Sequence, residues 1–254
     1  MIQCVNRSLD IMLCVSDMRG QPITISEISK KTGINESTCC HIIETLLKRG
    51  FLKQISRSAG YVLGIYSYTL TRYKDFHHGL IMTCSPILDW LERKTGYTVV
   101  LANLIDGEKF VLSYSESPEN SLKDKGDLYK GTLYDSATGR AMLATMSEKE
   151  LKNVVANVGL PNENEWPEVT DFKSLLKELK KQERLVRVDM KDDGDKHISK
   201  FGVAFIPYKQ ERFAIGLDYH SKTKPTDKEI KNIEKEIIIA ANEIERRIKF
   251  SMEK

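Results

Sequence analysis

The chain has 254 residues, of which 41% are hydrophobic and 30% are charged, a composition that suits one large folded domain or two smaller ones. It contains no run of about 18 apolar residues, so the sequence predicts no membrane-spanning helix. The opening stretch, MIQCVNRSLDIML, has polar and acidic residues where a signal peptide needs an unbroken apolar core, and we therefore expect a cytoplasmic protein.

The net charge of +3 is concentrated at one end of the chain. Residues 1–70 carry 8 Lys/Arg and 5 Asp/Glu, whereas the remaining 184 residues carry 31 of each. A mild basic excess favours contact with nucleic-acid phosphates there without establishing it. All five cysteines lie in the first third without a C-x-x-C pair, which indicates reduced structural thiols rather than disulfides or a zinc site.

The first predicted helix runs from Cys4 to Arg19. Its expected buried side has apolar residues at the three- and four-residue spacing of an amphipathic helix: Val5, Leu9, Met12, Leu13 and Met18. We expect this helix to support the motif that follows and to complete a three-helix core.

Residues 23–64 carry the most informative pattern. Thr24 and Glu27 have the spacing of a capping box and predict a helix start, while Gly33 suits the left-handed residue at the helix end. Asn35 is placed to cap a second helix by accepting its free backbone N–H groups. One side of that helix is apolar at helical spacing and is expected to be buried, comprising Cys39, Ile42, Ile43, Leu46 and Leu47.

The opposite side of the second helix is polar, and a short two-stranded ribbon follows it between Phe51 and Leu63. Two helices plus a ribbon predict a winged helix-turn-helix, whose second helix enters the major groove of DNA. Ser37, Thr38 and His41 would contact bases or nearby phosphates, and Lys53 and Arg57 the backbone. The full set of expected DNA-binding residues is Asn35, Ser37, Thr38, His41, Lys48, Lys53 and Arg57. The alternatives are a helical domain that binds only protein and, for Arg57, an ordinary polar turn residue.

An amphipathic linker helix is predicted over residues 65–83, because apolar side chains recur at three and four residues: Tyr66, Leu70, Tyr73, Phe76 and Leu80. The next helix is expected to be capped by Ser85, to begin at Pro86 and to end at Gly96, with Ile87, Leu88 and Leu91 buried. The adjacent His77 and His78 would lie about 100° apart on a helix, so no metal site is expected there.

A hairpin is predicted from residues 97–104 and 109–115, with Asp106-Gly107 as its turn, followed by a loop over 118–128 that could form a ligand lid. Helices capped by Ser147 and Asp171 come next, and strands are predicted over 185–190, 201–208 and 212–219. The last helix has six periodic apolar positions: Ile230, Ile233, Ile237, Ala241, Ile244 and Ile248. This order predicts an α+β domain with an antiparallel sheet flanked by helices.

The stretch YDSATGRAMLATM, residues 134–146, is the most distinctive part of this second domain. Ser136 or Asp135 would cap a short helix of small residues, which lets a ligand or another element approach the backbone. A helix N-terminus favours an anion. Close packing of the helix on a sheet is the alternative explanation of the small residues.

These features together resemble IclR-type bacterial transcription regulators over nearly the whole chain. The resemblance is carried, in order, by ETLLKRGFLKQ, GYVLG, PILDWLERKTGYTVVL and DSATGRAMLA. It implies a winged helix-turn-helix over residues 1–65, a linker helix over 66–83 and a GAF-like domain over 84–254 that binds an effector and forms dimers or tetramers. It also implies double-stranded operator DNA as a partner and no cofactor.

Carried over from the family, the effector-binding residues are Ala137, Thr138, Asp192, Gly202, Gly216 and Asp218. This sequence departs from the family at three of these positions: the family commonly has Cys at the position of Gly202 and small hydroxyl residues near Gly216 and Asp218. The departures argue against a typical small carboxylate, and Asp218 instead favours a ligand with a donor or a cation. A metal site formed by Asp192, His197 and Asp218 has no support from spacing.

The resulting hypothesis is a transcription regulator whose DNA binding is modulated by a small molecule. One alternative is a regulator whose second domain serves assembly and senses no ligand. The other is an enzyme, which is disfavoured because the sequence has no G-x-S-x-G, no H-E-x-x-H and no phosphate-binding glycine loop.

Overall fold

The structure is a computed structural model that describes residues 2–18, 20–56, 58–70, 77–118, 133–182, 184–191, 197–208, 211–221 and 225–252. Its contacts divide the chain into two compact units, Met1–His78 and Gly79–Lys254. Each unit encloses a hydrophobic core of its own.

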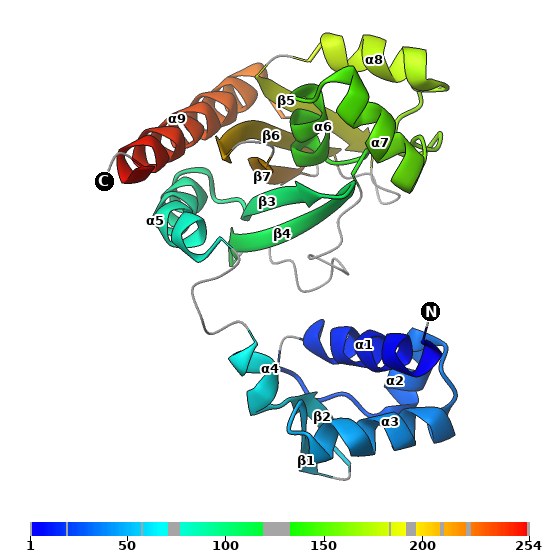
Figure 1. Cartoon of the computed structure of the whole chain (residues 1–254). Coiled ribbons are helices and arrows are strands. Elements are labelled where there is room, and N and C mark those ends of the chain that lie inside the picture. Colours follow the sequence, from blue (N-terminus) through cyan, green and yellow to red (C-terminus); the bar gives the residue numbers. More distant parts are fainter. Residues whose placement is uncertain are drawn as a thin grey trace. The chain divides into compact units, whose positions relative to one another are not determined.

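The first unit contains three helices followed by a two-stranded ribbon and one more short helix (Figure 1). These elements are α1 (Gln3–Ser16), α2 (Ile25–Thr32), α3 (Glu36–Lys48), β1 (Leu52–Ser56), β2 (Gly60–Leu63) and α4 (Ile65–Thr69). The capping box of Thr24 and Glu27 is present, and Gly33 ends α2 with φ of 70°. Asn35 caps α3 by accepting from the backbone N–H of Thr38 at 2.9 Å. The predicted helix ends are therefore confirmed.

Backbone hydrogen bonds join the ribbon to the segment that precedes α2. Ile23 and Tyr61 form an isolated antiparallel bridge with N···O distances of 3.0 and 2.9 Å. Gly60 lies beside this bridge at φ of 96°, where a Cβ would overlap the carbonyl of Ile23. The wing consequently has a fixed position relative to α2 and α3, which share the core of this unit.

The predicted buried side of α1 is wrong for Val5, Leu9 and Leu13, whereas Met12 and Met18 do pack against the core. Ile11, Cys14 and Val15 face the core, whereas Val5, Leu9 and Leu13 are exposed and Met12 is only partly buried. The helix has two apolar stripes, and periodicity alone does not say which one packs against α2 and α3. The outward stripe, Ile2, Val5, Leu9 and Leu13, is more than half exposed at every position.

The second unit is built on a five-stranded antiparallel sheet with the order β4-β3-β7-β6-β5. Its strands are β3 (Val99–Ile105), β4 (Glu108–Ser115), β5 (Leu185–Lys191), β6 (His197–Tyr208) and β7 (Glu211–Ser221). The Asp106-Gly107 turn joins β3 to β4, with positive φ at both residues as a two-residue hairpin requires. The two strands predicted to be central, β6 and β7, do lie inside the sheet.

Helices cover both faces of this sheet (Figure 1). On one face, α5 (His78–Thr95) and α9 (Asp227–Met252) share the largest core with the strands, and all six predicted positions of α9 are buried. The other face is covered by α6 (Ala137–Ala144), next to α7 (Glu148–Val158) and α8 (Phe172–Lys180). Because side chains alternate along a strand, Phe201, Val203 and Ile215 face the α5–α9 core and Gly202 and Gly216 face α6.

The predicted start of α5 at Ser85 and Pro86 is also wrong. The helix begins at His78 and continues through Pro86, and the Ser85 hydroxyl donates to the carbonyl of Ile81 at 2.8 Å instead of capping. The two additional turns bury Leu80 and Cys84 with Ile87, Leu88 and Leu91, and this burial outweighs the hydrogen bond that proline removes. The predicted linker helix over 65–83 is accordingly divided: α4 ends at Thr69, and Tyr73 and Phe76 lie outside the described residues.

Across the described ranges, no helix combines the length and apolar character that crossing a bilayer requires.

Candidate functional site

One face of α3 presents polar side chains to solvent. Ser37, His41, Thr45 and Lys48 are exposed and Thr38 is partly buried, while Cys39, Ile42, Ile43 and Leu46 face the core. The separation follows from the helical repeat, since the two groups lie on opposite sides of the helix. A recognition helix needs such a face, with donors and acceptors free of the protein interior.

Local contacts already engage some of the predicted DNA-binding residues. The Asn35 side-chain oxygen is occupied as the N-cap of α3, so in this structure Asn35 fixes the start of the helix. Lys48 Nζ lies 2.7 Å from Glu44 Oε1, and both side chains are largely exposed. An exposed pair of this kind contributes little to stability, so Lys48 can exchange Glu44 for a phosphate.

The wing supplies one further cation next to α3. Lys53 is exposed on β1, whereas Arg57 lies outside the described residues. Sequence reasoning missed Arg49, which is exposed at the C-cap of α3, one residue beyond Lys48. The sequence signal that could have identified Arg49 is its place directly after Lys48, at the basic end of the predicted helix before Gly50.

In the second unit, the predicted effector residues cluster where α6 meets the sheet, with little space between them. Ser136 caps α6 by accepting from the N–H of Gly139 at 3.1 Å, which settles the choice between Ser136 and Asp135. A Cβ on Gly202 would lie 2.5 Å from the carbonyl carbon of Ala137, and one on Gly216 would overlap the methyl group of Thr138. Close packing therefore explains the small residues here, and ligand contacts from these four residues remain a prediction.

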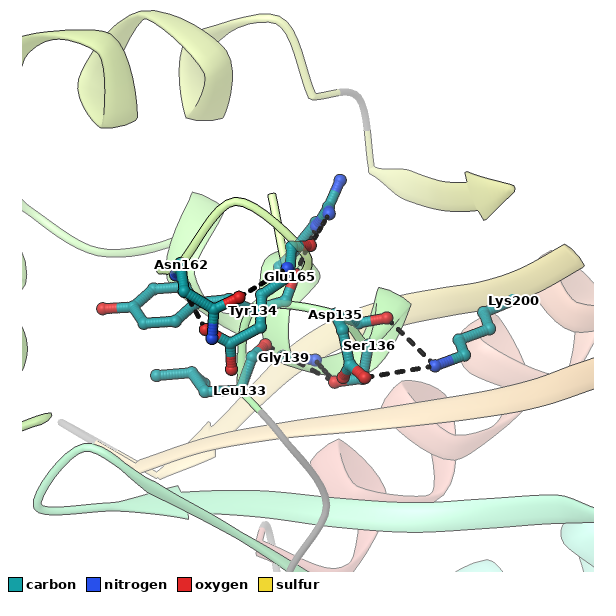
Figure 2. Close-up of polar contacts among 9 residues, drawn as sticks. Leu133, Tyr134, Asp135, Ser136, Gly139, Asn162, Glu165 and Lys200 are labelled. Atoms are coloured by element: carbon teal, nitrogen blue, oxygen red, sulfur yellow. Dashed lines mark hydrogen bonds and ion pairs between the residues drawn. The ribbon is translucent and has the colours of Figure 1, made fainter. Parts of the chain in front are cut away.

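A charged cluster borders the start of α6. Lys200 on β6 donates to the backbone carbonyl of Asp135 at 3.1 Å, and its Nζ lies 3.7 Å from the Asp135 carboxylate (Figure 2). Lys200 is also the cross-strand partner of Asp218 on β7. A cation thus already faces Asp218 within the chain, so its charge does not call for a cationic ligand.

Lys109 on β4 belongs to the same charged region. Partial burial lowers the pKa of its ammonium to about 8, despite the opposing effect of Asp218 and Asp135. Sequence reasoning missed both Lys109 and Lys200, because it considered only positions carried over from the family. The signal for Lys200 was its place two residues before Gly202, on the same face of a strand.

The three residues considered as possible metal ligands, Asp192, His197 and Asp218, are not brought together by the described structure. Asp192 lies outside the described residues. His197 pairs with Ser221, three positions along the ladder from the Lys200–Asp218 pair, so His197 and Asp218 point to opposite faces of the sheet. These two residues therefore do not share a metal site.

Arg140 joins α6 to the segment that follows α7. Its Nε donates to the carbonyl of Tyr134 at 2.6 Å, its Nη2 donates to the carbonyl of Glu165 at 2.8 Å, and its guanidinium lies 3.9 Å from the ring centroid of the buried Trp166. Tyr134 in turn donates its hydroxyl to the carbonyl of Gly159 at 2.7 Å. These contacts hold the backbone around the start of α6 in one arrangement.

Replacing Gly202 with Ala is expected to lower the free energy of unfolding of the second unit by about 1–3 kcal/mol, because the new methyl group overlaps the α6 backbone. Chemical denaturation followed by tryptophan fluorescence measures this unit selectively, since Trp90 and Trp166 are the two tryptophans of the chain. Gly79→Ala is the matched control, because that helical glycine has open space around it and should gain about 0.5–1 kcal/mol. Equal stability of the Gly202 variant and wild type would show that α6 can move off the sheet.

Comparison with known families identifies these two units. Residues 5–56 match the IclR helix-turn-helix domain, and residues 76–246 match the C-terminal domain of the bacterial transcriptional regulator IclR. The chain belongs to the IclR family. Among curated members, it is 22% identical over 161 residues to the transcriptional repressor IclR of Escherichia coli and 25% identical over 178 residues to the regulator BhcR of Paracoccus denitrificans. The matches cover 63% and 70% of this chain, and the chain spans only 58% and 63% of those relatives.

Solved structures of IclR-family proteins have the same fold. The IclR transcriptional regulator of Alicyclobacillus acidocaldarius superposes with a TM-score of 0.71 at 17% identity, over 97% of this chain and 98% of that one. An IclR homologue of Microbacterium hydrocarbonoxydans, solved in complex with 4-hydroxybenzoate, gives a TM-score of 0.71 at 15% identity, over 97% and 99% of the two chains. The N-terminal helix-turn-helix and the mixed helix and antiparallel sheet domain predicted from the sequence are therefore confirmed.

Proposed function

We propose that this protein is a sequence-specific transcription regulator whose affinity for operator DNA is modulated by a small molecule bound in its second unit. The observation that carries the proposal is the exposed polar face of α3, in a winged helix-turn-helix that matches the IclR DNA-binding domain. In this proposal residues 1–65 bind DNA, 66–83 link the two parts and 84–254 bind the effector. Regulation, rather than catalysis, is the role that family membership supports.

On DNA, the start of α3 would lie in the major groove. Ser37, Thr38 and His41 would contact base edges or nearby phosphates, with Lys48, Lys53 and Arg57 on the backbone. Asn35 would hold the helix start in place through its cap. We propose a cytoplasmic location as well, because a protein that acts in this way works on chromosomal DNA.

A second copy of the chain would provide the second DNA-binding unit. The outward stripe exposes three apolar side chains of α1 and that of its N-cap residue Ile2, and exposed apolar patches of this kind mark interaction surfaces. Pairing two copies through identical stripes gives two-fold symmetry, and a palindromic operator has the same symmetry. We propose a homodimer, or a tetramer formed from two dimers, on such a site.

The effector would act by binding one arrangement of this assembly better than another, because only differential affinity shifts an equilibrium. The solved relative with 4-hydroxybenzoate supports a small organic molecule as the class of ligand. In this chain the polar groups near the start of α6 include Asp135, Ser136, Lys200, Asp218 and Lys109, and they support this part of the second unit as the effector site.

Selection of genomic DNA fragments on the purified full-length protein tests the proposal. We expect enrichment of a short palindrome, bound with an affinity that falls steeply as salt concentration rises. Selection is repeated with a metabolite extract, since the protein could require its ligand first. If no fragment were enriched either with or without the metabolite extract, a role in sequence-specific DNA binding would be rejected.

Replacing His41 with Ala is expected to cost about 1–3 kcal/mol of binding to the selected operator and little on random DNA, as loss of a base contact does. Lys53→Ala is the matched comparison: it should weaken binding to both DNAs alike and reduce the salt dependence by about one phosphate contact. Fluorescence anisotropy with both DNAs over a range of salt concentrations measures the two effects. Equal losses on both DNAs for His41→Ala would place His41 on the backbone.

A further inference from the structure

Glu44 lies at the centre of the exposed face of α3. A rotation of about 100° per residue places it within about 40° of Ser37 and Lys48 around the helix, and the buried side chains of Ile42 and Leu46 point the other way. Its side chain is 61% exposed. None of the DNA contacts expected from the sequence is acidic, so DNA that lies against this face meets a carboxylate with no role in that set.

The carboxylate of Glu44 has one oxygen engaged and one open. Oε1 lies 2.7 Å from Lys48 Nζ, and within the described residues no hydrogen bond reaches Oε2. The hydrogen bond and charge of Lys48, and then the charge of His41, lower the pKa of Glu44, so the group is ionised at neutral pH. When Lys48 exchanges Glu44 for a phosphate, a full negative charge is left at the centre of the face.

An ionised carboxylate in the major groove needs a hydrogen-bond donor from a base. It has acceptors only, so guanine O6 and N7 or thymine O4 leave it unpaired and repel it. The donors of the groove are the N4 amine of cytosine and the N6 amine of adenine. Adenine has the acceptor N7 beside its amine, whereas cytosine presents its amine alone. Cytosine is therefore the base that best fits Glu44.

The position of Glu44 along α3 gives it a base pair of its own. It follows Ser37 by seven residues, which is about 10 Å along the helix at about 1.5 Å per residue. Successive base pairs are about 3.4 Å apart, so these two side chains reach different base pairs. Glu44 is also about one turn beyond His41, on the same exposed face.

We propose that Glu44 determines the specificity of α3 at one base pair of each operator half-site, by accepting a hydrogen bond from the N4 amine of a cytosine. Guanine and thymine at that position are rejected, because their acceptors face a carboxylate. Lys48 turns to a phosphate and leaves both oxygens of Glu44 available. This inference rests on the proposed DNA-binding function and names a base that its operator contains.

Fluorescence anisotropy tests the inference with the full-length protein, the selected operator and operators in which each base pair is replaced in turn. In wild type, replacing one particular cytosine of each half-site with thymine should lower affinity at least fivefold. Glu44→Ala should bind the cytosine and thymine operators equally. It should also bind the thymine operator and random DNA more tightly than wild type does, because the repelled carboxylate is gone. Glu44→Gln should prefer adenine at that position, since an amide pairs with both N6 and N7.

Glu27→Gln is the matched control. Glu27 is an exposed acid of the same unit, on α2, and glutamine can retain its capping box with Thr24. This variant removes the same charge as Glu44→Gln and should leave every base preference as in wild type. Folding does not confound the test, because Glu44→Ala loses only an exposed ion pair and gains a residue that favours the helix.

Three results would overturn the inference. One is a pattern of base preferences in Glu44→Ala that is unchanged, or weakened equally at every base pair. Another is a preference that depends on Glu44 but is for a base other than cytosine. The third is loss of the same cytosine preference in Lys48→Met, which would assign the base contact to Lys48 with Glu44 as its positioning partner. Under the inference, Lys48→Met weakens binding to all the operators alike and keeps the cytosine preference.

Wild type and the variants test different claims. A wild-type protein that selects no operator would reject the proposed function, and this inference with it. A wild-type protein that selects an operator whose base preferences do not depend on Glu44 would keep the proposed function and reject the inference alone.

Discussion

Replacing Leu9 with Lys is expected to separate the two DNA-binding units of the proposed dimer and to lower affinity for the palindromic operator by about 100-fold or more. Leu9 is at the centre of the outward stripe of α1, and 54% of its surface is exposed in the single chain. A lysine there places like charges opposite one another across a two-fold interface. Affinity for a whole palindrome would fall toward that of one half-site, because binding of the second unit gains about 10²–10⁴-fold from being linked to the first.

Fluorescence anisotropy with a full operator and with a half-site measures this loss, and light scattering gives the oligomeric state of the same samples. Half-site affinity should change little, since Leu9 lies outside the core of its own unit. Ile206→Lys is the matched control, because Ile206 is 51% exposed on β6 of the second unit. Wild-type affinity of Leu9→Lys for the full operator would mean that the α1 stripe does not join two copies.

Replacing Glu150 with Ala is expected to lower the free energy of unfolding of the second unit by about 2–3 kcal/mol. Glu150 makes two kinds of contact at once. Its Oε2 accepts from the backbone N–H and the hydroxyl of Ser147 at 2.8 and 2.7 Å, which completes the cap of α7. Its Oε1 lies 2.8 Å from Nη2 of Arg212, whose side chain is only 10% exposed and would lose this carboxylate.

Glu229→Ala separates these two contributions. Glu229 closes the same kind of capping box on Thr226 at the start of α9, with oxygen contacts of 2.7 and 2.6 Å, and has no ion pair there among the described residues. Denaturation followed by tryptophan fluorescence should therefore show the larger loss for Glu150→Ala. Equal losses in the two variants would mean that Arg212 finds sufficient compensation in Thr145, whose hydroxyl it already contacts at 3.1 Å.

The stabilisation by Glu150 should also depend on pH. Hydrogen bonds from Ser147, and then the interaction with Arg212, lower the pKa of Glu150 in the folded protein. A carboxylate with a lowered pKa stabilises the fold at pH values above its unfolded pKa of about 4.3, and the contribution is lost as the pH falls through the folded pKa below that value. The stability difference between wild type and Glu150→Ala should thus be constant near neutral pH and shrink in acid.

The sequence by itself determined the ends of many helices and the unit that contacts DNA in the proposed function. The capping boxes of Thr24 with Glu27, Ser147 with Glu150 and Thr226 with Glu229 form between residues three apart, so no distant contact is needed to specify them. The polar face of α3 likewise follows from the helical repeat. The hairpin at Asp106-Gly107 is equally local, because the two residues adopt the positive φ values that the turn requires.

Tertiary structure alone decided which apolar surfaces are buried and which charges meet. Core packing selected Ile11 and Val15 of α1 over Leu9, and burial of Leu80 extended α5 through Pro86, where a local rule predicted an end. Lys109, Lys200 and Asp218 come from three different strands, and only the strand order and register bring them to one region. A sequence specifies the chemistry of each side chain, but the pairing of distant strands determines which side chains are neighbours.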